Sequence, residues 1–293
     1  MDQDGNPSKY NIYNKLWLND QQEKGKVPSD FIGKFENRQS SAELKELSIP
    51  FDYAKPVRLL AYLLEIFRCN EHDIVLDFFA GSASLSHAVM LFNAQHGKNL
   101  RSICVQLPEA VEPESEAGKA GFKTITEIAR ERIRRAGRKI RDEFVDSDID
   151  AGFKSFRLSR SNISIWNPDR NDLEQSLLSH EEHLVEGRNE QDILYELLLK
   201  RGVELAVPIE SREVNGKNIY SIGYGVLFAC LVEKISREQV EDIAQGILDW
   251  HTELSPSSDT HVFFRDSAFR DDVSKTNMAA ILEQNGISHV RSL

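Results

Sequence analysis

The sequence predicts an α/β protein, because short buried strands alternate with amphipathic helices along most of its length. Residues 73–79 (DIVLDFF) form a nearly continuous apolar run, which is typical of a parallel strand covered on both faces. Residues 84–97 follow with helical spacing and end at a glycine, and residues 101–107 (RSICVQL) predict a second buried strand. Strand, helix and strand within about 35 residues predict a βαβ unit.

Helices are predicted on both sides of this unit. Residues 55–69 have apolar side chains at helical spacing. Residues 124–144 predict a long helix that opens with a capping-box pattern, Thr124 followed by Glu127. Its apolar stripe consists of Ile125, Ile128, Ile133, Ala136, Ile140 and Phe144. Residues 1–45, by contrast, are polar and weakly patterned, and predict loop or loosely held surface.

The second half of the chain continues the α/β pattern. A strand is expected within residues 153–166, and an Asn-Gly pair at 215–216 between alternating segments predicts a hairpin. Helices are expected at residues 170–186, 189–201, 236–251 and 270–285, and the last of them closes the chain. A further strand is expected at residues 261–266. The expected domains are a polar N-terminal segment (1–48), a cofactor-binding subdomain (49–168) and a C-terminal α/β domain (169–293).

The composition is typical of a soluble globular protein, with 40% hydrophobic and 28% charged residues. The formal net charge of −11 provides no overall attraction to nucleic acid, so DNA binding would need a local basic face or another chain. No stretch approaches about 18 apolar residues and no signal peptide is recognisable, so no membrane association is expected. Cys69, Cys104 and Cys230 match no metal motif and are interpreted as reduced thiols of a cytoplasmic protein.

The segment DFFAGSAS (77–84) is the first candidate for chemistry. Asp77 ends the first strand, and Gly81 lets the backbone turn without a Cβ clash. The following helix would direct its N-terminus at a ligand, and doubly wound sheets bind ligands beyond the carboxyl ends of their strands. One glycine in a turn is equally compatible with an ordinary strand–turn–helix corner, so both interpretations stay open at this point.

Three weaker features have ordinary explanations. Gln106 ends the second strand, where dinucleotide-like sites carry a ribose-binding acid, but alone it is interpreted as a simple strand-end residue. The basic run 130–141 is interpreted as the solvated face of an amphipathic helix rather than a phosphate-binding surface. His180 and His183 are three residues apart, but no acid or cysteine completes a ligand set, so no metal site is predicted.

Taken together, several segments resemble one known family. FDYAKPVRLL (51–60), IVLDFFAGSAS (74–84), VQLPE (105–109) and GFKTITEIARERIRRAGRKI (121–140) look like parts of the modification (Mod) subunits of type III restriction–modification systems. These subunits are β-class amino-methyltransferases that use S-adenosylmethionine. The resemblance continues in order through residues 161–169, 192–210 and 263–287.

The resemblance implies a Rossmann-like, S-adenosylmethionine-dependent methyltransferase sheet that is incomplete here, followed by a smaller α/β domain. The residues expected to line the methionine end of the cofactor are Phe51, Asp52, Lys55 and Pro56. The expected cofactor loop consists of Asp77, Phe78, Phe79, Ala80, Gly81 and Ser82, with Gln106 where relatives often have a ribose-binding acid. The family loop usually continues Gly-Thr-Thr, whereas Ala83 follows here; it would cost roughly 1 kcal/mol or more if that position needs a positive φ.

One family motif is absent from the sequence. Amino-methyltransferases hold the flipped base with an Asp/Asn/Ser-Pro-Pro-aromatic tetrapeptide. The nearest string here, NPDR (167–170), lacks the second proline and the aromatic residue. No catalytic residue is therefore assigned, and we expect the C-terminal part of a Mod-type DNA (adenine-N6) methyltransferase that is inactive alone.

The expected partners follow from the same resemblance. DNA is expected to bind through an upstream region or a partner chain. The open edge of the incomplete sheet is expected to be covered either by a homodimer or by a rearranged N-terminal segment, residues 1–45. The restriction (Res) subunit is a further candidate partner. A non-enzymatic dimerisation module is the main alternative, and a methyltransferase acting on RNA or a small molecule is another. No G-x-G-x-x-G motif supports a Rossmann dehydrogenase.

Overall fold

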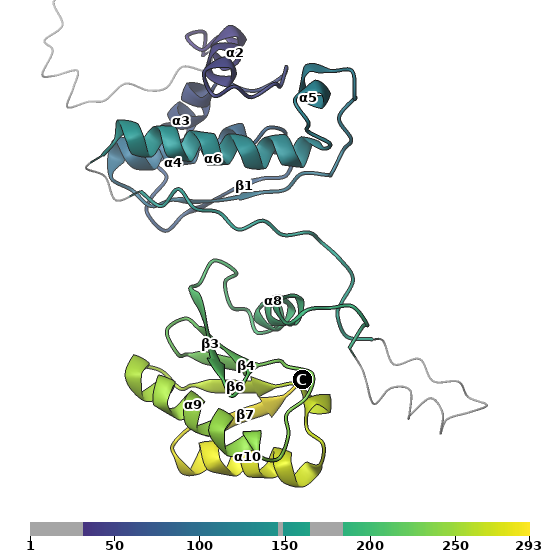
Figure 1. Cartoon of the computed structure of the whole chain (residues 1–293). Helices are drawn as coiled ribbons and strands as arrows, with labels where there is room; N and C mark the ends of the chain where they lie inside the picture. The colour runs from purple at the N-terminus through teal and green to yellow at the C-terminus, as the bar shows by residue number, and fades with distance from the viewer. Residues whose placement is uncertain (1–31, 146–148, 165–183) are drawn as a thin grey trace, which may run out of the picture. The chain divides into compact units, whose positions relative to one another are not determined.

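The computed structural model describes residues 32–145, 149–164 and 184–293 (Figure 1). Contacts divide the chain into two compact units, Met1–Ser155 (unit 1) and Phe156–Leu293 (unit 2), and each is described by itself. The domain boundary expected between residues 168 and 169 lies outside the described residues. Both units contain helices and strands, which confirms the α/β class.

A βαβ element forms the centre of unit 1, as the sequence predicts. β1 (Ile74–Asp77) pairs in parallel with β2 (Arg101–Cys104), and the register places Asp77 opposite Cys104. α4 (Ser84–His96) connects the two strands and ends at Gly97, whose φ of 59° is the left-handed C-cap that a glycine favours.

A buried asparagine fixes the return from α4 to β2. The Asn93 side chain donates from Nδ2 to the carbonyl oxygen of Leu100 and accepts at Oδ1 from the Leu100 amide, both at 2.9 Å. Asn93 and Leu100 are both buried. The side chain thus pairs two backbone groups that would otherwise be desolvated without a partner.

Helices cover one face of the β1–β2 sheet in unit 1 (Figure 1). On that face, the hydroxyl of Ser86 in α4 lies 3.1 Å from Ser102 Oγ and 3.0 Å from Cys104 Sγ. The side chains on the opposite face of the sheet are between 47% and 49% exposed; they are Ile74, Leu76, Ile103 and Val105. The expectation that β1 is covered on both faces is therefore wrong, because the described helices of unit 1 pack on one side only.

Two predicted helices pack beside α4. α3 (Val57–Ile66) begins after Pro56 and buries Val57 and Ala61 against Ala88 of α4. α6 (Ile125–Glu143) begins at its N-cap Thr124, whose hydroxyl accepts a hydrogen bond from the Glu127 amide at 3.3 Å. The carboxylate of Glu127 accepts from the Lys123 amide at 2.7 Å, so the helix start is capped from both directions, although not by the strict capping box.

Two further helices of unit 1 lie where the sequence predicts loops. α2 (Asn37–Glu46) falls inside the segment expected to be loop, which is a correction. Its sequence is polar because only one side, with Ser40 and Leu44, is buried, while Leu47 and Ile49 just after it enter the same core as α6. The short α5 (Glu116–Lys119) lies in the acidic connection between β2 and α6.

Unit 2 is built on a five-stranded sheet with the order β3-β4-β5-β6-β7. β3 (Ile209–Val214), β4 (Lys217–Ile222) and β5 (Leu227–Cys230) are antiparallel neighbours, while β6 (His261–Phe264) and β7 (His289–Ser292) continue the sheet in parallel with β5. The predicted hairpin is confirmed: Asn215 and Gly216 connect β3 and β4 with φ values of 47° and 73°.

The sheet of unit 2 lies between two helical layers (Figure 1). α8 (Glu190–Lys200) packs Leu194 and Leu198 on one face, and its start carries a complete capping box formed by Asn189 and Asp192. α9 (Gln239–Leu254) and α10 (Asp272–Gln284) pack on the other face. The expected helices at 189–201, 236–251 and 270–285 and the strand at 261–266 are thereby confirmed within a few residues.

The predicted and observed elements differ at residues 153–186 and at the end of the chain. The strand expected at 153–166 is wrong for the described residues 153–164, which form one isolated bridge, Ile163 with Leu184. Phe153 and Phe156 are each followed by a basic residue, but this segment has no partner strand among the described residues. The helix expected at 170–186 falls mostly on residues that are not described. β7 was not predicted, because its sequence, HVRS, is short and polar.

The described residues include all three cysteines and helices of several lengths. Cys69, Cys104 and Cys230 are free thiols, and burial raises the pKa of Cys230 to about 12. Across residues 32–145, 149–164 and 184–293, no helix has both the length and the apolar character needed to cross a bilayer.

Candidate cofactor site

The loop after β1 is tied to the end of β2. The Ala80 amide donates to the carbonyl oxygen of Val105 at 3.1 Å, and the Gly81 amide donates to the side-chain oxygen of Gln106 at 2.8 Å. The nitrogen of the same Gln106 amide donates to Glu109 Oε1 at 3.2 Å. Two residues singled out from separate segments of the sequence, Gly81 and Gln106, are therefore in direct contact.

The segment before α3 approaches the same loop. A methyl group added to Gly81 would meet the Cζ atom of Phe51 at 3.8 Å, so the ring of Phe51 lies next to this glycine. Pro56 is buried and serves as the N-cap of α3, while Asp52 and Lys55 are exposed. The structure thus brings Phe51 to the loop, while the side chains of Asp52 and Lys55 are exposed at the surface of unit 1.

The loop residues differ in exposure. Asp77 accepts a hydrogen bond from the Phe79 amide at 3.1 Å, which closes the turn after β1. The rings of Phe78 and Phe79 are 65% and 89% exposed, whereas Ala80 and Ser82 are buried. The loop therefore presents aromatic rings outward and keeps its second half inside unit 1.

Ala83 has the strained conformation that the sequence left undecided. Its φ and ψ are 61° and 42°, the left-handed region, and it is the N-cap of α4 without a side-chain capping bond. Its methyl group is fully buried in the core that includes Ile128 and Met90. An L-residue in this region costs roughly 1–2 kcal/mol relative to glycine, so alanine at this position carries a conformational cost.

A fully buried arginine lies behind the loop. Arg132 of α6 is 0% exposed, and its Nη1 atom donates to Ser82 Oγ at 2.7 Å and to Ser84 Oγ at 2.8 Å. Its Nε and Nη2 atoms are buried and have no hydrogen-bond partner among the described residues. Burial lowers the pKa of Arg132 to about 10.

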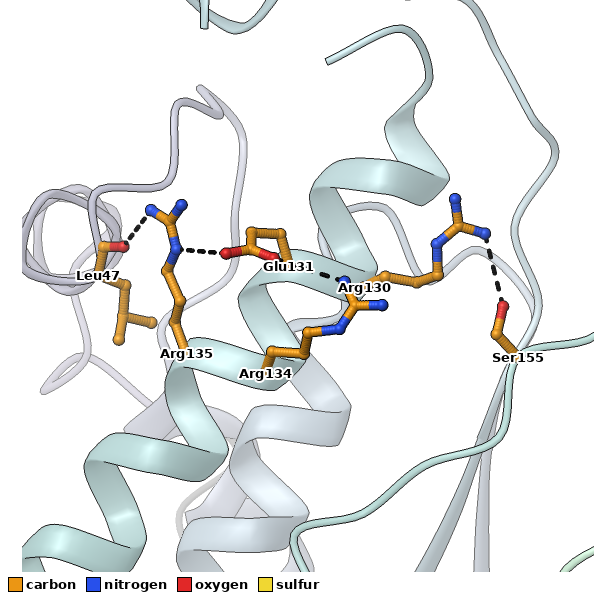
Figure 2. A network of polar contacts seen from close by, with 6 residues as sticks. All are labelled: Leu47, Arg130, Glu131, Arg134, Arg135 and Ser155. Carbon is orange, nitrogen blue, oxygen red and sulfur yellow. Dashed lines mark hydrogen bonds and ion pairs between the residues drawn. The ribbon is translucent and has the colours of Figure 1, made fainter. Parts of the chain in front are cut away.

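The basic run of α6 is only partly a solvated face (Figure 2). Arg135 donates from Nε to Glu131 at 2.8 Å and from Nη1 to the carbonyl oxygens of Leu47 at 3.0 Å and Ser48 at 2.7 Å. Hydrogen bonding from Arg135 lowers the pKa of the Glu131 carboxyl. The interpretation as solvent-facing charge is wrong for Arg132 and Arg135, which hold the loop and the end of α2.

Three other arginines of the run, Arg130, Arg134 and Arg138, fit the interpretation as a solvated helix face better. Arg134 reaches Glu131 at 3.4 Å and Arg130 reaches Ser155 Oγ at 3.5 Å, both in exposed positions (Figure 2). Arg138 is exposed as well. These side chains are available to solvent on the outer side of α6.

Arg132 and Ser84 were missed as site residues, although the sequence carried a signal for the first. Arg132 follows Ile128 by four residues and precedes Ala136 by four, so helical spacing places it on the apolar stripe. A charged residue on a buried stripe is the informative exception. Ser84 gave no such signal, because its contact with Arg132 spans 48 residues.

The described residues fit a ligand such as S-adenosylmethionine in two respects. The first amides of α4 have no intrahelical partner, and Ala83 offers no side chain to cap them, so they can receive a carboxylate. The exposed rings of Phe78 and Phe79 offer apolar surface for an adenine. Within the described parts of the chain, no group of three or more His, Cys, Asp or Glu side chains gathers as for a metal ion.

Known proteins share sequence with part of this chain. The Mod subunit of the type III restriction–modification enzyme StyLTI from Salmonella typhimurium is 37% identical over 125 residues, which are 42% of this chain and 19% of that subunit. The EcoP15I Mod subunit from Escherichia coli is 38% identical over 127 residues, 42% of this chain and 18% of that subunit. The type II methyltransferase M.KpnI from Klebsiella pneumoniae is 30% identical over 78 residues, 26% of this chain and 19% of that enzyme.

A βαβ element with a glycine loop at the carboxyl ends of its strands, together with these similarities, makes the chain a relative of methyltransferases. The match covers less than a fifth of the length of each Mod subunit described above. No protein-family model matches the chain. Within the methyltransferases, the chain is related to the Mod subunits of type III restriction–modification enzymes, which confirms the resemblance read from the sequence.

Proposed function

We propose that unit 1 binds S-adenosylmethionine in a Rossmann-like arrangement, with the loop at residues 77–84 as its centre. When bound, this cofactor supplies an electrophilic methyl group. The observation that carries the proposal is the 2.8 Å hydrogen bond from the Gly81 amide to Gln106. It joins the carboxyl ends of both strands of the βαβ element, the place where ligands of such sheets bind. The neighbouring Phe51 ring supports the same location.

We further propose that the chain is the cofactor-binding and C-terminal portion of a site-specific DNA (adenine-N6) methyltransferase of a type III restriction–modification system. Its sequence contains no Asp/Asn/Ser-Pro-Pro-aromatic tetrapeptide to hold a flipped base. The target base and the DNA are therefore assigned to residues outside this chain. Methyl transfer to duplex DNA by the purified chain alone would contradict this assignment.

Calorimetry with S-adenosylhomocysteine tests the cofactor site. Gly81 and Gly97 have φ values of 53° and 59°, so alanine is similarly strained at both positions. Gly81→Ala is expected to weaken binding, because the strain falls on the amide that contacts Gln106. Gly97→Ala is the matched control at the far end of α4 and is expected to keep the affinity. A wild-type chain that shows no binding at millimolar ligand would overturn the proposal.

A second candidate function, a self-association module, is favoured by the open face of the β1–β2 sheet. Ile74, Leu76, Ile103 and Val105 form an apolar row that the described part of unit 1 leaves half exposed. A parallel sheet is normally covered on both faces, and a second copy of the chain would supply such a cover. Sedimentation should then show a dimer that Ile103→Glu dissociates, with Val145→Glu, which is exposed elsewhere in unit 1, as control. A wild-type monomer at all concentrations would refute it.

A further inference from the structure

Two histidines are stacked at the β6–β7 end of the sheet in unit 2. His261 in β6 and His289 in β7 are cross-strand partners, so both side chains lie on the same face of the sheet. Their ring centroids are 4.6 Å apart and their planes differ by 15°. Phe263 follows two residues further along β6 on that face and packs in the same core as α8. The imidazole pair therefore lies on the α8 side of the sheet.

Two arginines flank the same pair of strands. Arg201 is the C-cap residue of α8, and its Cζ atom lies 5.4 Å from the centroid of the Phe263 ring. Arg291 is the cross-strand partner of Phe263, so it shares that face. Both arginines are exposed, and neither side chain has a hydrogen bond or an ion pair within residues 32–145, 149–164 and 184–293. They form, with the imidazole pair, the basic cluster of unit 2.

The basic cluster contains little compensating negative charge. The charged groups that act on His261 are His289, Arg201, Arg291 and one carboxylate, Asp259. Asp259 Oδ2 lies 3.9 Å from His289 Nε2, but the Asp259 side chain is 90% exposed, so water screens it. Such an excess of basic groups stands out in a chain with a formal net charge of −11. A bound anion would reduce the repulsion within the cluster.

The geometry of the donors indicates which anion fits. A carboxylate has two oxygens, which the fork of one guanidinium can satisfy. A phosphate group has more oxygens and a larger charge, so it can accept from two arginines on different elements and from an imidazole together. A metal ion is disfavoured, because Arg201 and Arg291 are permanent cations that would repel it.

We propose that Arg201, Arg291 and the imidazole pair of His261 and His289 bind a phosphate group in unit 2. Two sources share this chemistry, a small free phosphate compound and the backbone of a nucleic acid. Contacts to phosphate carry no base sequence, so recognition of a target base stays with residues outside this chain. The site lies in unit 2, so it does not depend on the cofactor function proposed for unit 1.

The imidazole pair couples this binding to protons. Partial burial, followed by the charges of His289, Arg201 and Arg291, lowers the pKa of His261. A phosphate anion favours the protonated imidazole, so the pair takes up a proton on binding. The bound site is then protonated at a higher pH than the free site, and the imidazole pair should tighten binding between about pH 7.5 and about pH 5.5.

The direct test is the Arg201→Met/Arg291→Met double variant of the full-length chain. Methionine keeps an apolar side chain over Phe263 while it removes the charge. The two probes are inorganic pyrophosphate, followed by calorimetry, and a labelled single-stranded oligodeoxynucleotide, followed by fluorescence anisotropy. The double variant should lose about tenfold or more in affinity for the probe that the wild type binds. With the oligonucleotide, the salt dependence should also fall by about 0.7 in log–log slope for each arginine that contacts a phosphate.

Arg237→Met/Arg270→Met is the matched control, because it removes the same number of charges from exposed positions of unit 2. Arg237 precedes α9 and Arg270 precedes α10, the helices on the other face of the sheet. Both arginines act electrostatically on nearby carboxylates, Glu238 and Asp271. The control should therefore bind either probe within about twofold of the wild type, because the distant charges are screened.

A second comparison tests the imidazole pair. The His261→Gln/His289→Gln variant should bind with a weaker dependence on pH than the wild type. Both proteins meet the same ionisation of the probe, so the difference between them reports the two imidazoles. Identical pH dependence in the two proteins would overturn the role of the pair.

The outcomes with the two probes separate the sources. Selective loss of pyrophosphate binding in Arg201→Met/Arg291→Met supports a small phosphate ligand, and selective loss of oligonucleotide binding supports a nucleic-acid backbone. Equal affinities of the two arginine double variants, or a wild-type chain that binds neither probe, overturn the inference. S-adenosylhomocysteine binding should be the same in Arg201→Met/Arg291→Met and the wild type, so failure of this inference is distinguishable from failure of the proposed function.

Discussion

The side-chain oxygen of Gln106 accepts a hydrogen bond from the Gly81 amide over 2.8 Å, although the two residues are 25 positions apart. The contact fastens the loop after β1 to the end of β2. It also occupies one acceptor position of the Gln106 side-chain oxygen. Gln106 therefore supports the loop directly, whatever it contributes to a ligand.

Replacing Gln106 should test this support. Gln106→Met removes the acceptor, and leaving the Gly81 amide unpaired is expected to cost about 1–2 kcal/mol, seen as weaker S-adenosylhomocysteine binding. Gln106→Glu keeps an acceptor for the Gly81 amide but replaces the donor to Glu109, 3.2 Å away, with a second carboxylate. It should therefore bind less tightly than the wild type, with part of the loss recovered at high salt. Calorimetry that finds the same affinity for Gln106→Met and the wild type would contradict the role.

Ala83 and Ala88 form a matched pair for measuring the strain of the loop. Both methyl groups are fully buried, and losing one costs roughly 0.8 kcal/mol. Ala88→Gly also weakens the interior of α4 by about 1 kcal/mol, whereas Ala83→Gly relieves a left-handed alanine by a similar amount. Urea unfolding should therefore find Ala83→Gly more stable than Ala88→Gly by about 2 kcal/mol. A difference of only about 1 kcal/mol, the helix-interior effect of Ala88→Gly by itself, would show that Ala83 carries no strain.

Arg135 is expected to matter more for stability than its neighbour Arg134. Arg135 donates to two backbone carbonyl oxygens after α2, and removing a charged donor from such groups costs about 1–2 kcal/mol at a partly exposed site. Arg134 makes two exposed contacts, an ion pair with Glu131 at 3.4 Å and a cation–π contact 5.5 Å from the centroid of the Phe153 ring, and together they contribute less than about 1 kcal/mol. Arg135→Met should lower the free energy of unfolding by about 1–2 kcal/mol, and Arg134→Met should lower it less. The reverse order of the two variants would refute the capping role.

The buried His87 is expected to make the stability of unit 1 sensitive to acid. Burial lowers its pKa to about 3 from the ordinary value of 6.5, so the unfolded chain binds the proton more readily than the folded one. Stability is therefore complete above pH 6.5 and falls as the pH drops towards about 3, by about 1.4 kcal/mol per pH unit in that window. The positive groups facing the ring, Arg132 and Lys139, act in the same direction.

A non-titrating variant should remove this component. Between about pH 7 and about pH 5, His87→Met is expected to lose roughly 2 kcal/mol less than the wild type in urea unfolding. His96→Met, at the exposed end of α4, is the matched control and should keep the acid sensitivity that His87 contributes. A wild-type chain and a His87→Met variant with the same dependence on pH would contradict a buried neutral imidazole.

The local sequence determined most of the individual elements. Hydrophobic periodicity and end signals placed the βαβ element, α3, α6 and the hairpin at Asn215 and Gly216, because these depend on residues close together in the chain. The same local reasoning failed for α2 and β7. Both are polar and short, and each is held by contacts with residues far away in the sequence, such as Arg135 for the end of α2.

The candidate site divides in the same way. The local sequence placed a strand end, a glycine and a helix start at residues 77–84, which fits a cofactor loop and an ordinary corner equally well. Only the resemblance to Mod subunits singled out Asp77 to Ser82 and Gln106 as expected cofactor residues. Only the tertiary structure decided that Gly81 contacts Gln106, that Ala83 is left-handed, and that Arg132 is buried against Ser82 and Ser84. Backbone strain and burial depend on which helix packs behind the loop, and that is a property of the folded chain rather than of any short segment.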